Sequence, residues 1–251
     1  MISRYKATMD GVLLNSIHEM LQVLDIRYES SEMQRNTARR ASGSGVYATN
    51  PYRQSTSVTI DFELHLYDTR ERQRVCQQVI AWARGSVLKT SDRPGQRLHV
   101  VCDSYPAIES SLRWTDTLSV TFTAYALPYW EEEFPATATL TNASGTLFVP
   151  GNVSEQGAKV DAEITANAAL TALTLAVGSN SITLSGISVP KNGKIILSHD
   201  ENGHLSIKYG NTSLMNKRTG SDDLLAENGK TNTVRVSGNA ACKFSVRGLW
   251  M

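Results

Sequence analysis

The sequence predicts a mainly β protein, with an α+β first half and an antiparallel β-sandwich in the second half. Residues 55–67, STSVTIDFELHLY, alternate apolar and polar side chains, which is the pattern of a half-buried strand. Apolar residues at helical spacing occupy one segment, 68–85. From Thr137 onward, short β-branched runs are separated by Gly, Asn or Asp, as in a sandwich of short strands.

The first half is expected to place strands around one helix. LQVLDIRYE near the start predicts a strand. In the strand 55–67, one face carries the apolar residues Val58, Ile60, Phe62, Leu64 and Leu66. Segments 97–102 (RLHVVC) and 117–125 (TLSVTFTAY) predict two further strands.

The helix is expected to follow the strand 55–67 directly. Asp68 or Thr69 can cap its first turn, and Gly85 is expected to end it in a left-handed conformation. Its apolar side recurs every three or four residues and contains Val75, Cys76, Val79, Ile80 and Ala83. This side is expected to lie against the sheet.

A long polar segment separates the first two predicted strands of this half. The residues between Glu29 and Ser57 contain almost no aliphatic side chain and many Ser, Arg, Gly and Asn residues. Such a segment cannot form its own core, so it is either disordered or an arm that reaches a neighbouring subunit. We favour the extended intersubunit arm.

The composition changes at PYWEEEFPA, residues 128–136, where an acidic run lies between two prolines. Proline resists both helix and sheet pairing, so we predict a first domain at 1–130, a linker at 131–136 and a second domain at 137–251. The second domain is expected to contain nine short strands: ATLTN, GTLFVPG, KVDAEITA, ALTLAVG, NSITLSG, KIILSHD, HLSIKYG, NTVRVSG and CKFSVRGLW. ENGH at 201–204 and KNGK at 191–194 are candidate hairpin turns.

Composition argues against several function classes. A formal net charge of +1 gives no general case for specific nucleic-acid binding or for binding to a membrane surface. The three cysteines, at 76, 102 and 242, have no metal-ligand spacing and are expected to be reduced. No apolar run approaches the roughly 20 residues of a membrane span, so we expect assembly in a cytoplasm.

Catalytic and metal sites are not indicated, and we expect no enzyme activity, metal or organic cofactor. His199 and His204 flank two acidic residues, but a hairpin turn is expected to hold the two imidazoles apart or in solvent rather than on one ion. Glu131, Glu132 and Glu133 are consecutive, so they are expected to be a solvated run and lack the opposed geometry of a glycosidase pair. No nucleophile elbow or phosphate-binding loop is present.

The whole chain resembles the distal tail proteins of siphophages. The opening YKATMDGVLLNSIHEMLQVLDIRYE is similar to the first strands of that family, with a turn at Asp10 and Gly11 before Leu13 and Leu14. A polar loop, a strand, a helix ending in AWARG, a strand pair and an aromatic PYW follow in the family's order. The closing segment 223–251 is also similar, and it carries Leu225, Gly229, Asn232, Val234 and a terminal Trp250.

This resemblance implies a tail-tube-like β-barrel or sandwich with one helix, followed by a galectin-like β-sandwich. It implies a structural component of a bacteriophage virion, a homo-hexameric ring at the distal end of the tail that is assembled in the host cytoplasm. Such a ring would join the tail-tube protein to tail-tip, baseplate or receptor-binding proteins. The alternative function is a carbohydrate-binding module that contacts the host surface.

Two sets of residues are candidate contact sites. Arg35, Arg39, Arg40 and Arg53 of the polar segment could contact DNA in a tail channel or acidic residues of a neighbouring subunit; we favour the subunit contact, because a channel should not hold phosphate. Phe148, Phe244 and Trp250 are expected in the core of the second domain, which leaves Tyr209 as a weak sugar platform. In the first domain Trp114, Tyr125, Tyr129 and Trp130 are expected in the core, although Tyr129 and Trp130 could instead join the two domains.

Overall fold

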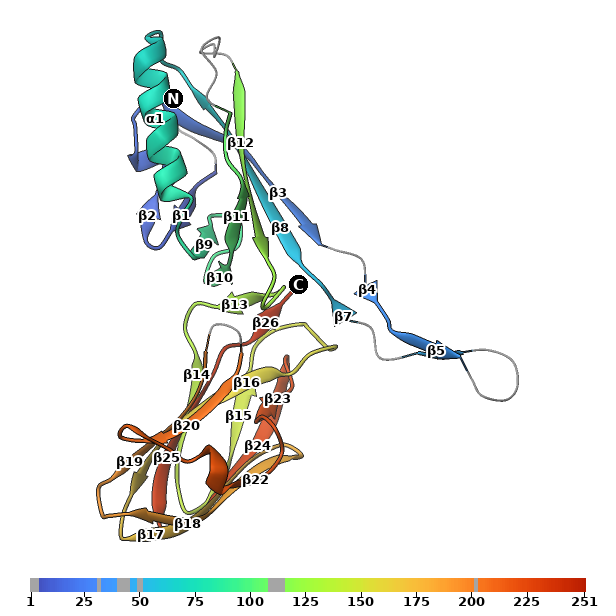
Figure 1. The fold of residues 1–251 in the computed structure, drawn as a ribbon, viewed down its shortest axis with the longest axis vertical. Helices are drawn as coiled ribbons and strands as arrows, with labels where there is room; N and C mark the ends of the chain where they lie inside the picture. The colour runs from blue at the N-terminus through green and yellow to red at the C-terminus, as the bar shows by residue number, and fades with distance from the viewer. Residues whose placement is uncertain (1–4, 31–32, 40–45, 49–51, 108–115, 201–202) are drawn as a thin grey trace. The chain divides into compact units, whose positions relative to one another are not determined.

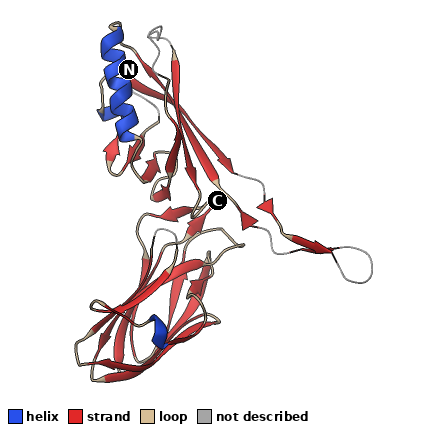
Figure 2. Cartoon of the chain, viewed as in Figure 1, coloured by secondary structure: helices blue, strands red, loops and turns tan. Residues whose placement is uncertain are grey.

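The computed structural model describes residues 5–30, 33–39, 46–48, 52–107, 116–200 and 203–251. Most of the regular elements in these ranges are strands, as Figure 2 shows, and the prediction of a mainly β fold is confirmed. The chain divides into two compact units, Met1–Trp130 and Glu131–Met251. Each unit buries apolar side chains of its own strands.

An antiparallel four-stranded sheet forms one layer of the first unit. Across the sheet the strands are β11 (Val101–Ser104), β12 (Thr117–Ala124), β8 (Thr56–Leu64) and β3 (Leu21–Ser30). The side chains of β8 alternate strictly between buried and half-buried, and Val58, Ile60, Phe62 and Leu64 all face the core. The predicted alternation is therefore confirmed.

A second sheet of this unit contains the chain's first strands. Its neighbouring strands are β2 (Val12–Leu13), β1 (Ala7–Met9), β9 (Val87–Thr90) and β10 (Gln96–His99). Asp10 and Gly11 have φ of 48° and 85°, which is the left-handed pair that a tight hairpin requires.

Segment 97–102 was predicted as one strand, and this prediction is wrong. The Val100 amide donates to Ser86 O at 2.9 Å, and the chain passes there from β10 into β11 of the other sheet.

The helix α1 (Thr69–Trp82) begins where the sequence predicts it, and Figure 1 shows it beside the strands of its unit. The carboxylate of Asp68 accepts a hydrogen bond of 2.9 Å from the Arg70 amide, so Asp68 is the N-cap. The apolar side of the helix buries Val75, Cys76 and Val79.

Gly85 does not end the helix in the predicted way. It lacks a positive φ, and the last turn instead tightens, with the Gly85 amide donating to Trp82 O at 3.2 Å. Glycine is required there for space, because a Cβ would collide with the side chains of Met9 and Asp10. The Asp10 carboxylate accepts hydrogen bonds from the amides of Ser86 and Val87, so the β1–β2 turn is fixed against the chain that follows the helix.

The second unit contains two antiparallel sheets, as the strand pattern predicts. One sheet contains β14 (Ala136–Thr141), β25 (Ala240–Val246), β16 (Ala158–Ala166), β19 (Lys194–His199), β20 (Leu205–Tyr209) and β21 (Thr212–Ser213), with β23 (Leu225–Ala226) also paired to β16. The other contains β15 (Ser144–Val149), β24 (Lys230–Ser237), β17 (Leu170–Val177), β18 (Asn180–Val189) and β22 (Arg218–Gly220). Eight of the nine predicted strands are present, whereas CKFSVRGLW is divided into β25 and β26 (Leu249–Trp250), which belong to different sheets. Residues such as Ile164, Leu173 and Phe244 are fully buried.

The two predicted turns of this unit have different roles. The β19–β20 hairpin is confirmed: Gly203 has a φ of +78°, and the Asp200 amide donates to His204 O at 3.1 Å. Asn192, in KNGK, has a φ of 65°, but this turn is not a hairpin. It connects β18 to β19, which belong to different sheets.

Several aromatic residues that were predicted in the core are exposed or only half-buried. Phe148 and Tyr125 are 58% and 59% exposed, so both core predictions are wrong. In β15 the neighbours of Phe148, Leu147 and Val149, are buried, and strand alternation therefore turns Phe148 outward. Phe244 is buried as predicted. Trp250 is half-buried, and Trp114 lies outside the described residues.

Tyr129 and Trp130 belong to the core of the first unit. Both are almost completely buried, and the ring of Trp130 meets that of Tyr28 edge to face, with centroids 5.8 Å apart. The guanidinium of Arg93 lies 5.1 Å from the Trp130 ring centroid, in the range of a cation–π contact. These contacts account for the burial of Trp130 within its own unit.

The acidic run is not a solvated stretch. The first two of its three glutamates belong to strand β13 (Trp130–Glu132). Strand β26 (Leu249–Trp250) follows Gly248. The Glu132 amide donates to Gly248 O at 3.0 Å, and the Glu132 carboxylate accepts 2.8 Å from the Trp250 indole. Arg247 donates to Glu132 O at 2.9 Å. Glu132 is thus part of the folded second unit, and the expectation of a solvated run was wrong.

Candidate functional site

The polar segment between the first two long strands contains paired strands. We call residues 33–54 the arm. Its described parts are β4 (Met33–Gln34) paired with β7 (Tyr52–Arg53), and β5 (Thr37–Arg39) paired with β6 (Val46–Ala48), both antiparallel. The arm follows the last pairs of β3 and β8, Ser30 with Thr56 and Glu29 with Ser57, and Figure 1 shows the resulting ribbon.

The contacts of the arm are polar and exposed. The side chains of residues 33–38 are all exposed, and Met33 and Tyr52 are 40% and 39% exposed. Gln54 donates to Gln34 Oε1 at 2.8 Å across the ribbon. A two-stranded ribbon without a buried apolar face is marginally stable in water. The described side chains of β4 and β7 form no such face.

The arginines proposed for subunit contact differ in position and in exposure to solvent. Arg35 is exposed in the arm. Arg53 lies at its base, half-buried, with its guanidinium 5.9 Å from the Tyr129 ring centroid. Arg39 ends β5, and Arg40 lies outside the described residues. Of the two side chains that the structure describes, only that of Arg35 is presented to solvent.

The four-stranded sheet has one face of polar side chains, which we call the polar face. It comprises Gln22, Asp25, Arg27 and Glu29 of β3, Ser57, Thr59, Asp61 and Glu63 of β8, and Thr117, Ser119, Thr121 and Thr123 of β12. These residues oppose one another in register across the three strands. The opposite face is the buried core of this unit.

Hydroxyl groups of the polar face hydrogen-bond to their cross-strand partners. The pairs are Ser57 with Thr123 at 3.1 Å, Thr59 with Thr121 at 3.0 Å, and Ser119 with Asp61 at 2.6 Å. Asp61 also forms an ion pair of 3.0 Å with Arg27. The face carries four carboxylates and one guanidinium, so it is acidic, and much of its hydrogen-bonding capacity is used within the sheet.

Both edges of this sheet are unpaired among the described residues. β3 pairs only with β8, and β11 pairs only with β12. Beside the β11 edge, Val101, Tyr105 and Tyr125 are 60%, 43% and 59% exposed; on β3, Leu24 is 38% exposed. Strand directions alternate across the sheet, so the edge strands β3 and β11 run in opposite directions. A second copy can therefore continue the sheet without breaking the alternation.

The two histidines near the β19–β20 hairpin have different surroundings and different carboxylate partners. His204 is exposed and pairs with Asp200 at 3.2 Å. The His199 side chain is only 7% exposed, with Nδ1 2.9 Å from Asp161 Oδ1 and Nε2 3.3 Å from Asp223 Oδ1. His199 thus connects β16, β19 and the chain before β23. No group of three or more His, Cys, Asp or Glu side chains in the described ranges is arranged to hold a metal.

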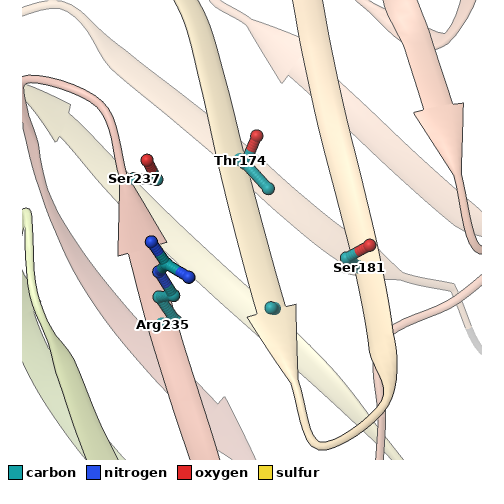
Figure 3. A pocket seen from close by; sticks show the side chains of 5 residues that line it. Thr174, Ser181, Arg235 and Ser237 are labelled. Atoms are coloured by element: carbon teal, nitrogen blue, oxygen red, sulfur yellow. The ribbon is translucent and has the colours of Figure 1, made fainter.

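Tyr209, the predicted sugar platform, does not line the depression found on the second unit. Tyr209 ends β20, half-buried, with its ring next to Gly193. The depression, of about 290 Å³, lies on the five-stranded sheet and is lined by Thr174, Ala176, Ser181, Arg235 and Ser237 (Figure 3). The sequence analysis singled out none of these residues. In the sequence, the only feature that could have indicated them is the series of Thr and Ser residues at the outward positions of these strands.

The chain was compared with family models, with curated protein sequences and with solved structures. No protein-family model and no curated protein sequence matches the chain. The crystal structure of the SPP1 Dit (gp 19.1) protein, described as a paradigm of the hub adsorption apparatus in phages that infect Gram-positive bacteria, aligns with a TM-score of 0.69. The alignment covers 97% of this chain and 98% of the SPP1 protein at 12% identity. This chain has the Dit fold.

The Dit fold extends over both units, because the alignment spans nearly the whole length of both proteins. Structures of the phage P2 baseplate in its activated conformation, with Ca and with Sr, also align. They cover 99% and 98% of this chain and 98% of theirs, at 10% and 9% identity. Their TM-scores of 0.47 are too low to add to the argument.

Among the described residues, none of the helices has the length and apolar character of a membrane span.

Proposed function

We propose that this chain is a structural, non-enzymatic distal tail protein of a siphophage or prophage. Its copies form a ring, six in our proposal, that joins the tail tube to the tail tip or baseplate and its host-adhesion proteins. The observation that carries this proposal is the Dit fold over almost the entire chain. The virion's distal tail end is the proposed location, after assembly in the host cytoplasm. The carbohydrate-binding alternative has no comparable support.

The edges of the four-stranded sheet support the ring. An exposed edge strand offers free amides and carbonyls to another strand, and apolar side chains lie beside the β11 edge. In a head-to-tail ring, the β11 edge of one copy meets the β3 edge of the next. Repeating this contact closes the ring when the rotation between copies divides a full turn.

The polar face suits the inside of such a ring. Its hydroxyls are paired with one another, so they gain little by binding a partner. Its four carboxylates repel phosphate, and DNA would pass without being held. We therefore propose that this face lines the channel, and that Arg35, Arg39 and Arg40 of the arm contact the neighbouring subunit rather than DNA.

The native mass of the full chain tests this proposal. We expect light scattering and negative-stain images to show rings of about six times the chain mass of 27.5 kDa. Val101→Lys should weaken the ring, because a charge at the edge opposes strand addition. Val12→Lys is the matched control, since Val12 is similarly exposed on β2, in the other sheet. A single-chain mass at all concentrations, or equal effects of both variants, would contradict the proposed assembly.

A further inference from the structure

The two outer faces of the second unit's sheets differ in charge. The sheet around β16 and β19 carries ion pairs on its outer face, such as Lys194 with Glu163 at 2.7 Å. The five strands of the other sheet, β15, β24, β17, β18 and β22, contain no aspartate or glutamate. Their outward residues are mainly Ser, Thr and Ala, with Phe148 on β15 and with Lys230 and Arg235 on β24, the second strand of the sheet.

Arg235 lies in the depression of this sheet. In register, its neighbours are Ser144 on β15 and Ala176 on β17. Both side chains are small, and Ala176 lines the depression of about 290 Å³ together with Arg235. Figure 3 shows Arg235 on the same strand as Ser237, with Thr174 and Ser181 across from them.

The polar groups of the depression are available to a ligand. Thr174 shares a hydrogen bond of 3.0 Å with Thr183. Within the described residues, the Arg235 guanidinium and the Ser181 and Ser237 hydroxyls have no hydrogen-bond or ion-pair partner. Arg218, at the edge of the same sheet, differs in this respect, since it pairs with Asp222 at 3.3 Å. The depression thus combines one unpaired cation with two free hydroxyl donors.

We infer that this depression is a binding site for an oxyanion group, either carboxylate or phosphate. A guanidinium presents parallel N–H donors that match two oxygens of such a group, and serine hydroxyls can donate to a third. Ala176 is the one apolar residue of the lining, so the rest of the ligand should be polar. This inference goes beyond the proposed function and does not depend on ring formation.

The site is expected to be weak and salt-sensitive. Arg235 is exposed, and water screens the attraction between an exposed cation and an anion. The absence of any carboxylate from the five strands removes competition for the guanidinium within the sheet. Specificity for oxyanions over chloride should come from the paired donors rather than from charge alone.

Calorimetric titration of the full chain with inorganic phosphate and, separately, with acetate tests this inference at constant ionic strength. We expect saturable binding of at least one of the two, with one site per chain. Arg235→Ala should weaken it at least about tenfold, because the charged donor is lost. Arg235→Lys should restore part of the affinity, because it keeps the charge without the planar donors. Binding of phosphate alone assigns a phosphate site, and binding of acetate alone assigns a carboxylate site.

Lys243→Ala provides the matched control. Lys243 is an exposed cation on β25, in the other sheet, and its removal changes the net charge by the same amount. Its loss should leave the affinity within about twofold of the original protein, since only long-range attraction is altered. The inference is overturned if neither probe saturates a site, or if Arg235→Ala and Lys243→Ala have equal effects. Thermal melting of all variants verifies that each is folded.

Discussion

The indole Nε1 of Trp82 donates a hydrogen bond of 2.7 Å to the carbonyl oxygen of Val12. This bond connects the last turn of α1 to β2, which belongs to the second sheet of the first unit. The same indole meets the Phe122 ring of the four-stranded sheet edge to face, with centroids 5.9 Å apart. Trp82 therefore contacts both sheets from one position on the helix.

Two substitutions of Trp82 are expected to destabilise the first unit to different extents. Trp82→Phe keeps an aromatic ring but loses the bond to Val12, at a cost of about 1 kcal/mol. Trp82→Ala also removes the ring and should cost about 3–5 kcal/mol. Urea denaturation followed by circular dichroism measures both. Arg84→Ala, at an exposed position beyond the helix, should change stability by less than about 0.5 kcal/mol; a similar loss there would show that the effect is not specific to Trp82.

The two units are expected to fold as separate proteins, and the position of the boundary affects the stability of the second. A fragment of residues 131–251 keeps the bonds of Glu132 to Gly248 and Trp250, whereas a fragment of 137–251 loses them. The bond from Arg247 to Glu132 O is lost as well, so we expect the shorter fragment to be less stable by about 3 kcal/mol, since each lost bond contributes about 1 kcal/mol. Thermal melting compares the two, and equal stability would place the boundary after the acidic run.

The arm is expected to stabilise the ring rather than its own unit. Deleting residues 34–54 and closing the gap with a short Gly/Ser turn should leave the monomer folded, because the β3–β8 pairing ends outside the deletion, at Ser30 and Thr56. The ring should dissociate at higher protein concentration than the unaltered ring does. Light scattering over a concentration series measures this. A deletion variant that assembles as tightly as the full chain would show that the arm is not a subunit clamp.

The charged residues of the arm should account for part of that contact. Replacing Arg35, Arg39 and Arg40 by Ala should weaken the ring less than the deletion does. If these residues form exposed ion pairs, the unaltered ring should be the more salt-sensitive of the two, which a salt series measures. Arg53→Ala is the control, because Arg53 contacts Tyr129 of its own unit and its loss should not change the salt dependence.

The cysteines are expected to differ in reactivity. Burial raises the pKa of Cys76 to about 11 and that of Cys242 to about 12, so both remain protonated and inaccessible in the folded protein. Burial also raises the pKa of Cys102, but this residue is only half-buried, on the edge strand β11. At pH 8 a thiol reagent should modify Cys102 first and the other two only as the protein unfolds. Rapid modification of all three would contradict the burial of Cys76 and Cys242.

The same two thiols imply a loss of stability at alkaline pH. Unfolding exposes Cys76 and Cys242 and returns their pKa to the ordinary value of 9.0, so the unfolded chain releases these protons at lower pH than the folded chain. Their contribution is complete below pH 9 and is lost as the pH rises toward 11 and 12. Urea midpoints at pH 8 and pH 10 measure the loss, and Cys242→Ala should reduce it. An unchanged difference between the two pH values in that variant would assign the loss to other groups.

The sequence by itself determined the features that depend on neighbouring residues along the chain. The period-two pattern of Val58, Ile60 and Phe62 predicted β8, and the carboxylate of Asp68 predicted the start of α1. The Asn-Gly pair of ENGH, residues 201–204, predicted the β19–β20 hairpin turn. Each of these follows from local geometry, because strand alternation, helix capping and left-handed turns involve only a few consecutive residues. The resemblance of the chain to siphophage distal tail proteins likewise followed from the order of its elements.

Only the tertiary structure decided the features that depend on distant segments. Gly85 is required by Met9 and Asp10, more than 70 residues earlier, and not by the end of its own helix. His199 is buried because Asp161 and Asp223 approach it from two other segments. Arg235 is left without a partner because strand register places Ser144 and Ala176 beside it. Register between strands is a property of the whole sheet, so no local pattern in the sequence contained this information.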